Sequence, residues 1–329
     1  MIYYLTTISF FLAIITSKFL VPYVIHFGNE FKILDKPDHR KKNTQKIVRF
    51  GGLVFIFSYL LSICMLIILN KYFLNIGINY NQILSFSFAS LCFYLIGLFD
   101  DIFLISPFPR LILQFFVAFF CWLNGLRIDF LYLPFTPFEN NLLYLSDALS
   151  IIFTLFWIVG VINAINWLDG LDGLAIGFSL VVFASILLLS ITSGNIFASI
   201  SASSLIGSSV IFYFYNKYPA KLMMGDGGSY FLGFTLACFS LSVSKFFLYE
   251  EGIYFLKAHI PILLLSVPLL DMVCVIVRRI LKQKSPFFPD RNHFHYLLID
   301  SGIGYKQTVR IIYLLSIFTS IIAISSKNL

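Results

Sequence analysis

Ten apolar runs, each long enough to cross a lipid bilayer, constrain this chain more than any other feature of its sequence. A helix needs about 20 mostly apolar residues to span the hydrocarbon core. Charged residues make up 12% of the 329 residues, against about 25% in soluble domains, and a soluble fold could not bury so much apolar surface. The runs cover residues 2–27, 51–69, 82–98, 111–125, 148–163, 174–193, 196–215, 229–247, 259–277 and 309–325.

These runs predict an all-α fold: a polytopic integral membrane protein of about ten transmembrane helices, forming a single domain over residues 1–329. The mean hydropathy of +0.89 excludes a soluble nucleic-acid binder, a disordered chain and a secreted disulfide scaffold. The first run follows no basic segment or cleavage site, so we expect a transmembrane helix and not a signal peptide. The cysteines contain no CxxC pair, which favours small core residues over a zinc site: Cys64, Cys92, Cys121, Cys238 and Cys274.

The loops between the runs differ sharply in charge. Those that join an odd-numbered run to the next even-numbered run hold 16 of the 23 Lys and Arg residues. They span residues 28–50, 99–110, 164–173, 216–228 and 278–308. Basic residues mark cytoplasmic loops. We therefore expect these five loops in the cytoplasm and both termini outside.

Acids and histidines lie in the same five loops. The set comprises Asp35, Asp38, Asp100, Asp101, Asp169, Asp172, Asp226, Asp290 and Asp300, with His39, His293 and His295. Solvation alone gives a membrane protein no reason to gather acids at one face. The sequence therefore predicts an active-site cleft at the cytoplasmic face.

Asp100 and Asp101 stand side by side at the end of the third run, in GLFDDIF. One interpretation is a solvated helix end, although acids at a helix C-terminus oppose the helix dipole. The other is a pair that handles phosphate or a divalent metal, because two carboxylates beside hydrocarbon are costly without a cation.

The segment NAINWLDGLDGLA places Asn163, Asn166, Asp169 and Asp172 at intervals of three. Glycines within it are expected to end the helix and let the backbone approach a ligand closely. An ordinary Gly-rich turn would explain the glycines but not two asparagines in apolar sequence. Asn with Asp suits a ribose, a base or a hydrated cation.

Asp226 precedes the eighth run in MGDGGS. It could be a simple N-cap. Its neighbouring glycines, however, leave amides open to an anion, and an acid beside a bound diphosphate requires a bridging divalent cation. We therefore expect Asp226 to be a Mg²⁺ ligand.

The longest polar signature is PLLDMVCVIVRRILKQKSPFFPDRNHFH. Asp271 lies inside an apolar run and could form a structural salt bridge with Arg278, two turns away. Arg291, His293 and His295 are clustered downstream; a His-x-His zinc site lacks further ligands, so diphosphate binding suits them better. The first loop, DKPDHRKKNTQKIVRFGG, is either a positive-inside anchor or a source of cations for a phosphorylated lipid.

Together these motifs resemble the polyprenyl-phosphate N-acetylhexosamine-1-phosphate transferases (glycosyltransferase family 4), and in particular the WecA type. The resemblance covers nearly the whole chain in the same order: DKPDHRK…GG, GLFDD, NAINWLDGLDGLA, MGDGGS and SPFFPDRNHFH. The PDRxHxH ending is closer to the WecA type than to the related MraY type, which has three consecutive histidines there. Asn43, Val48 and Tyr296 depart from the family pattern.

The resemblance implies a bacterial inner-membrane enzyme that depends on Mg²⁺, with Mn²⁺ as a substitute. It would transfer a sugar-1-phosphate, N-acetylglucosamine-1-phosphate above all, from a UDP-N-acetylhexosamine to undecaprenyl phosphate. UMP would leave, and the lipid product would start a cell-envelope glycan such as O-antigen or a teichoic-acid-like polymer. Direct attack and an aspartyl-phosphate intermediate both remain open, and members of the family are often homodimers.

The resemblance also implies roles for individual residues. Asp100, Asp101 and Asp226 would be catalytic and would hold the metal. Substrates would be bound by Asn163, Asn166, Asp169, Asp172, Asn216, Arg279, Arg291, His293 and His295. The alternatives are an MraY-type enzyme that uses UDP-MurNAc-pentapeptide, and a secondary transporter, which would place more acids inside the membrane.

Overall fold

Eight helices of the described chain are long and apolar enough to cross a membrane, which confirms the polytopic all-α fold. The computed structural model describes residues 1–35, 47–74, 79–132, 142–248, 253–287 and 290–328, so Asp38, His39 and Asn43 lie outside the described residues. The eight spans are α1 (Ile2–Glu30), α2 with a following π-helical turn (Gly52–Leu69 and Asn70–Leu74), α3 (Tyr80–Phe103), α5 (Asp147–Leu168), α6 (Leu174–Thr192), α7 (Ile196–Asn216), α8 (Gly225–Ser244) and α12 (Tyr305–Ser325).

The other two predicted spans differ from expectation. The fourth run forms α4 (Pro107–Leu123), which is apolar but has only 17 residues. The ninth run is not one continuous helix: it breaks at Leu265 into α9 (His259–Leu264) and α10 (Ser266–Leu281). Pro268 explains the break, because its ring lacks an amide proton and clashes with the carbonyl four residues earlier. The short helix α11 (Phe294–Asp300) follows α10.

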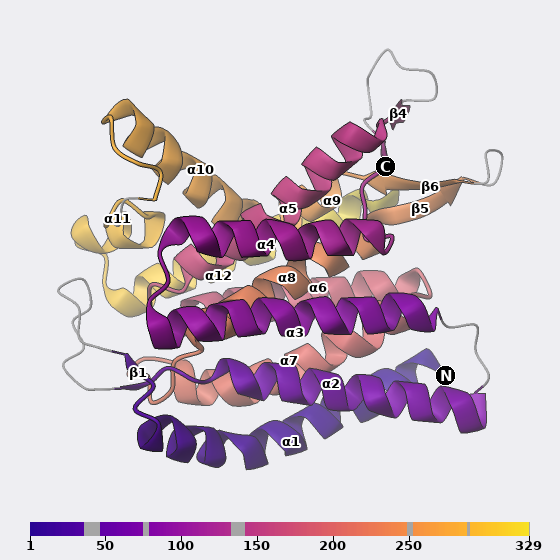
Figure 1. The fold of residues 1–329 in the computed structure, drawn as a ribbon, viewed down its shortest axis with the longest axis horizontal. Coiled ribbons are helices and arrows are strands. Elements are labelled where there is room, and N and C mark those ends of the chain that lie inside the picture. The colour runs from indigo at the N-terminus through magenta and orange to yellow at the C-terminus, as the bar shows by residue number, and fades with distance from the viewer. Residues whose placement is uncertain (36–46, 75–78, 133–141, 249–252, 288–289, 329) are drawn as a thin grey trace.

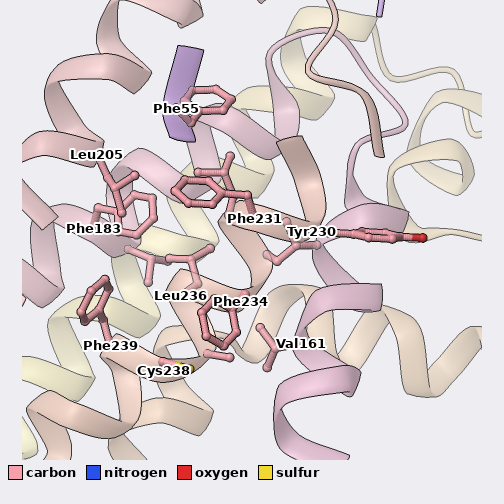
Figure 2. Packing of buried hydrophobic residues seen from close by; sticks show 14 of the residues in the cluster. Phe55, Val161, Phe183, Leu205, Tyr230, Phe231, Phe234, Leu236, Cys238 and Phe239 are labelled. Atoms are coloured by element: carbon pink, nitrogen blue, oxygen red, sulfur yellow. The ribbon is translucent and has the colours of Figure 1, made fainter. Parts of the chain in front are cut away.

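Helix α8 forms the centre of the bundle, with nearly all of its residues buried. It packs against α2, α3, α5 and α6, and the helices lie roughly side by side (Figure 1). Figure 2 shows Phe231 of α8 in one apolar cluster with Phe55 of α2 and Phe183 of α6. This rigid centre holds the start of α8, and with it Asp226, in a fixed place.

Two close helix contacts fix the approach of α2 and α3 to the start of α8. A Cβ on Gly97 of α3 would lie 2.3 Å from the carbonyl oxygen of Asp226. A Cβ on Gly52 of α2 would lie 2.4 Å from the amide nitrogen of Gly228. Real Cβ contacts are never this short, so only glycine permits these backbones to meet.

A four-stranded sheet, which the sequence did not predict, lies at one end of the bundle (Figure 1). Its order is β4-β3-β6-β5, formed by β3 (Phe130–Tyr132), β4 (Leu142–Tyr144), β5 (Lys245–Leu248) and β6 (Ile253–Lys257). Strands β3 and β6 pair in parallel, and the other pairs are antiparallel. The residues of β5 were expected to continue the eighth span, because aromatic and aliphatic strands have the composition of a membrane helix.

Both chain ends lie at the sheet end of the bundle (Figure 1). The opposite end holds α11 and a small antiparallel pair, β1 (Leu34–Asp35) with β2 (Ile47–Val48). Five connections that carry the sequence motifs meet at this opposite end, which is therefore the place to look for a site.

Candidate active site

A cavity of about 1360 Å³ lies at the motif-bearing end, where α3, α5, α8 and α10 end or begin. Nine residues expected to form the site line it: Asp101, Asn163, Asn166, Asp169, Asp172, Asp226, Arg279, Arg291 and His293. The other three, Asp100, Asn216 and His295, are buried beside it. The structure thus brings residues of four distant loops to one cavity.

Asp101 joins the end of α3 to the start of α8. Its Oδ1 accepts the amide N–H of Asp226 at 2.9 Å, and its Oδ2 accepts that of Gly227 at 3.1 Å. Arg49 adds an ion pair, with its Nε 2.9 Å from Asp101 Oδ1. Both oxygens are therefore occupied, and the carboxylate anchors the first turn of α8.

Asp100 and Asp226 are near neighbours. Their carboxyl groups are close enough to interact electrostatically, and each contacts an arginine. Arg110 of α4 donates to Asp100, and Arg49 Nη2 lies 2.7 Å from Asp226 Oδ1. Helices α3, α4 and α8, together with the segment before α2, thus place two acids and two cations in one cluster.

This pair of neighbouring acids fits a divalent cation. Two ionised carboxylates repel each other at close range, so their proximity is stabilised by a shared proton or by cations beside them. Mg²⁺ is typically held by one or two carboxylates together with substrate phosphates. Across the described ranges, no three His, Cys, Asp or Glu side chains form a ready metal cage. Because Asp101 faces the α8 amides, Asp100 and Asp226 are the better pair of ligands.

Asn163 and Asn166 project from the last turns of α5, which ends at Leu168 before Gly170, as the glycine pattern predicts. Asn166 Nδ2 donates to Asp226 Oδ1 at 2.8 Å and to Ser229 Oγ at 3.0 Å. Asn163 Nδ2 donates to Gln114 Oε1 at 2.7 Å. Asn166 therefore orients the Asp226 carboxylate, and Asn163 contributes an amide to the cavity wall.

Asp172 and Asn216 hold two loops together. Asp172 Oδ2 accepts the amide of Ala220 at 3.0 Å, and its own amide donates to the Tyr305 hydroxyl. Asn216 accepts the Gly173 amide at 3.1 Å and donates to the Leu222 carbonyl at 2.9 Å. Asn216 is only 1% exposed, so it shapes the cavity from behind.

Arg279 anchors the segment that follows α10. Its guanidinium donates to Asp290 at 2.9 and 3.2 Å and to the carbonyl of Pro286, and it lies 4.9 Å from the Trp167 ring centroid. Burial by itself raises the pKa of Asp290, but hydrogen bonds from Arg279 and Asn292 outweigh it and lower the pKa to about 2. The pair is therefore ionised at neutral pH. Arg279 organises this segment rather than facing the cavity freely.

Arg291 and His293 face the cavity, whereas His295 does not. The Arg291 side chain is 42% exposed, lies over the Tyr296 ring and contacts Asp300 at 3.3 Å. Burial, helped by the nearby His293, lowers the pKa of His295 to about 3, so this ring is neutral. The rings of His293 and His295 stack at 5.5 Å. Tyr296, where the family pattern often has histidine, donates to the Gly170 carbonyl at 3.1 Å.

The salt bridge considered between Asp271 and Arg278 is wrong. Asp271 instead contacts His293 and the amide of Phe294. Arg278 is exposed and donates to the Asn292 carbonyl at 3.0 Å. Spacing on one helix suggested the pair, but the segment after α10 folds back and supplies a nearer partner.

Three residues of the cluster were not identified from the sequence: Arg49, Arg110 and Gln114. Arg49 was one of seven basic residues in the first loop, although it lies next to the double glycine that packs against α8. Arg110 is the single basic residue of the 99–110 loop. Its place in the same loop as Asp100 could have suggested that the two form an ion pair. Gln114 is fully buried one turn further along α4, and its Nε2 finds no hydrogen-bond partner among the described residues.

Comparisons with known proteins show which family the chain resembles. The model of glycosyl transferase family 4 matches residues 83–244. A probable undecaprenyl-phosphate N-acetylglucosaminyl 1-phosphate transferase of Bacillus subtilis is 30% identical, over 98% of this chain and 85% of its own length. An undecaprenyl-phosphate alpha-N-acetylglucosaminyl 1-phosphate transferase of Haemophilus influenzae is 32% identical, over 90% and 80%. A phospho-N-acetylmuramoyl-pentapeptide-transferase of Staphylococcus carnosus is 28% identical, over 74% and 77%.

The fold and the site define a multi-pass membrane transferase whose acids and arginines meet in a cavity at one end of the helix bundle. The chain belongs to glycosyl transferase family 4.

Proposed function

We propose that this protein transfers N-acetylglucosamine-1-phosphate from UDP-N-acetylglucosamine to undecaprenyl phosphate, with release of UMP. The lipid-linked product would initiate a cell-envelope glycan. The observation that carries the proposal is the cluster at the cavity in which Arg49 contacts Asp226 and Arg110 contacts the neighbouring Asp100. The names of the Bacillus and Haemophilus relatives support the same donor sugar and acceptor.

The chemistry is a phosphoryl transfer between two anions, so repulsion is the main obstacle. Asp100 and Asp226 would hold Mg²⁺, or Mn²⁺ in its place, which supplies positive charge to the diphosphate and to the leaving UMP. Arg49 and Arg110, which already contact these carboxylates, are placed to stabilise charge on the same phosphates. A phosphate monoester is largely ionised at neutral pH, so orientation of the acceptor matters more than removal of its proton.

The donor would lie along the polar wall of the cavity. Asn163 and Asp169 line it on the α5 side, and Arg291 and His293 line it opposite. These side chains supply amides and carboxylate for the nucleoside and cations for the diphosphate. Asp172, Asn216 and Arg279 would act by holding their loops in place.

The acceptor would approach from the lipid. Leu104, Pro107 and Leu111, between the end of α3 and the start of α4, give the cavity an apolar edge close to Asp101 and Arg110. A prenyl chain can rest against such an edge while its phosphate reaches the cations.

We further place the protein in the bacterial inner membrane, with the cavity in the cytoplasm and both termini outside. The basic loops support this orientation, as does the position of both chain ends at the sheet end of the bundle (Figure 1). A homodimer, common in the family, is the oligomeric state we expect; light scattering of the purified protein measures it.

The test is a panel of UDP-sugars offered to the purified protein with undecaprenyl phosphate. We expect UMP release and, by mass spectrometry, a lipid product one N-acetylhexosamine phosphate heavier. UMP release should be faster with UDP-N-acetylglucosamine than with UDP-N-acetylgalactosamine or UDP-MurNAc-pentapeptide. A product from the pentapeptide substrate alone would establish the MraY-type alternative, and UDP-sugar flux without UMP release would establish a transporter.

Metal removal tests the role of the two acids. Excess chelator should abolish UMP release, and Mg²⁺ or Mn²⁺ should restore it. Asp226→Asn should remain inactive after the metal is restored, whereas Asp129→Asn, at the opposite end of the bundle, should behave as wild type. Undiminished turnover in chelator would refute the cation mechanism.

A further inference from the structure

The proposed function gives no role to Asp271, the acid of α10. Its side chain is only 8% exposed, although α10 presents Leu270, Val273 and Ile280 outward. An ionised carboxylate in such surroundings is costly unless hydrogen bonds satisfy both of its oxygens. The partners of Asp271 therefore show what the residue does.

Both oxygens of Asp271 bind the start of α11, more than 20 residues further along the chain. Oδ2 lies 2.8 Å from Nδ1 of His293, and Oδ1 accepts the amide N–H of Phe294 at 2.7 Å. A carboxylate can only accept, so the proton between Asp271 and His293 belongs to Nδ1. Nε2 is then the ring nitrogen left for a ligand.

The ring of His293 is fixed on its other sides as well. The edge of Trp167 meets it with 5.5 Å between ring centroids, and His295 stacks against it at the same distance. His293 lines the cavity, and its side chain is 9% exposed. The surroundings therefore restrict ring rotation and limit access to one part of the ring.

A second anchor holds the same segment independently. Arg279, two turns beyond Asp271 on α10, binds Asp290 and the Pro286 carbonyl. Arg278 adds a hydrogen bond to the Asn292 carbonyl at 3.0 Å. Because these contacts remain when Asp271 is changed, the segment does not depend on Asp271 alone for its position.

We propose that Asp271 is a positioning residue for the transferase reaction: it holds Nδ1 of His293 so that Nε2 faces the cavity, and it stabilises the imidazolium that donates to an anionic oxygen of the nucleoside diphosphate. The carboxylate acts through the ring and touches no substrate. A buried acid that orients a histidine in this way fixes the tautomer and supports a positive charge when an anion arrives. This inference rests on the proposed function.

The test is a double-mutant cycle with Asp271→Asn and His293→Gln. The glutamine amide places an N–H donor close to the position of Nε2 without needing a partner at Nδ1. In the wild-type background, Asp271→Asn should lower kcat/KM for UDP-N-acetylglucosamine by about 10- to 100-fold, the size expected for one hydrogen bond to a charged group. In the His293→Gln background the same change should cost about twofold or less. The KM for undecaprenyl phosphate should stay constant.

The matched control is Arg278→Gln, which removes another bond from α10 to the same segment without touching the His293 ring. It should retain wild-type kinetics. Equal losses from Asp271→Asn in both backgrounds, or the same loss in Arg278→Gln, would overturn the inference, because either result means general loosening of the segment.

Two further measurements keep the result decisive. If Asp271→Asn is absent from the membrane fraction, Asp271→Glu enters the cycle under the same criteria, since it keeps the charge and moves it by one methylene. The cycle is also run on UDP binding by calorimetry. A wild-type protein that binds UDP but makes no lipid product would refute the proposed function, whereas additive binding losses would refute the role of Asp271.

Discussion

At the scale of single residues, the guanidinium of Arg49 joins three parts of the protein. It extends from the end of the first basic loop and contacts Asp101 of α3 and Asp226 of α8 within 2.9 Å. Its Nε and Nη2 serve different carboxylates, and the planar, forked guanidinium holds these two donors apart in a fixed geometry, whereas an ammonium donates from a single nitrogen. Arg49 therefore determines how far apart the two acids stand.

Substitution of Arg49 tests this arrangement. Arg49→Gln should lower kcat by about 100-fold or more, the usual effect of removing one donor to developing charge. Arg49→Lys should recover only part of the activity, because an ammonium donates from one point on a flexible stem and does not reproduce the spacing of Nε and Nη2. Lys217→Gln, an exposed cation at the same end, is the control in the UMP-release assay. Full activity of Arg49→Lys would show that charge alone suffices.

His295 gives a prediction for stability against pH. Its folded pKa is about 3, mainly because of burial, while an unfolded histidine titrates near about 6.5. The unfolded chain therefore binds a proton that the folded chain does not, and stability falls as pH drops below about 6.5, by up to about 1.4 kcal/mol per pH unit. The melting temperature of the detergent-solubilised wild-type protein should fall more steeply between pH 7 and 5 than that of the His295→Gln variant. Parallel curves would contradict the assignment.

At the scale of elements, the close approach of α3 to α8 sets the geometry of the acids. Gly97 lies against the carbonyl of Asp226, and Asp101 of the same helix accepts the amides of Asp226 and Gly227. A shift of α3 would change the spacing between Asp100 and Asp226 directly. The packing of α3 against α8 and the geometry of the site are therefore coupled.

Gly97→Ala tests this coupling. Its Cβ would need the space of the Asp226 carbonyl, 2.3 Å away, so we expect a loss of about 1–3 kcal/mol in stability together with at least a tenfold loss of turnover. Gly160→Ala is the matched control, since its Cβ would meet only Met272 Cε at 3.9 Å. Thermal melting and UMP release measure the two effects. A loss of stability with full turnover would show that the α3–α8 contact and the geometry of the acids are not coupled.

At the scale of the whole molecule, the chain alternates between two ends with different chemistry. The cavity end holds the acids of the candidate site, His293 and His295, and the other end holds the sheet and both termini (Figure 1). Cysteine labelling tests which end faces the cytoplasm. In a background with the exposed Cys64 and Cys274 replaced by alanine, an impermeant maleimide should label Ser193→Cys on intact spheroplasts. Lys284→Cys should react only after permeabilisation, and the reverse pattern would invert the topology.

The sequence was informative where a motif and its neighbours act locally. Hydropathy predicted eight of the ten expected spans, and the glycines after Leu168 predicted the end of α5. Pairings across the chain could not be predicted: Arg49 lies 177 positions from Asp226, and Asp271 finds His293 only because the chain folds back after α10. The sheet was missed because its strands share the apolar composition of the spans.

The net charge of the acid–arginine cluster at the start of α8 also affects which anions can approach it. Its three carboxylates, when ionised, outnumber its two guanidinium groups, so the cluster carries one net negative charge. A bare nucleotide would meet electrostatic opposition there, whereas the same nucleotide accompanied by a divalent counterion would be drawn in. The protein would thereby discriminate between nucleotides by their net charge before it contacts the base or the sugar.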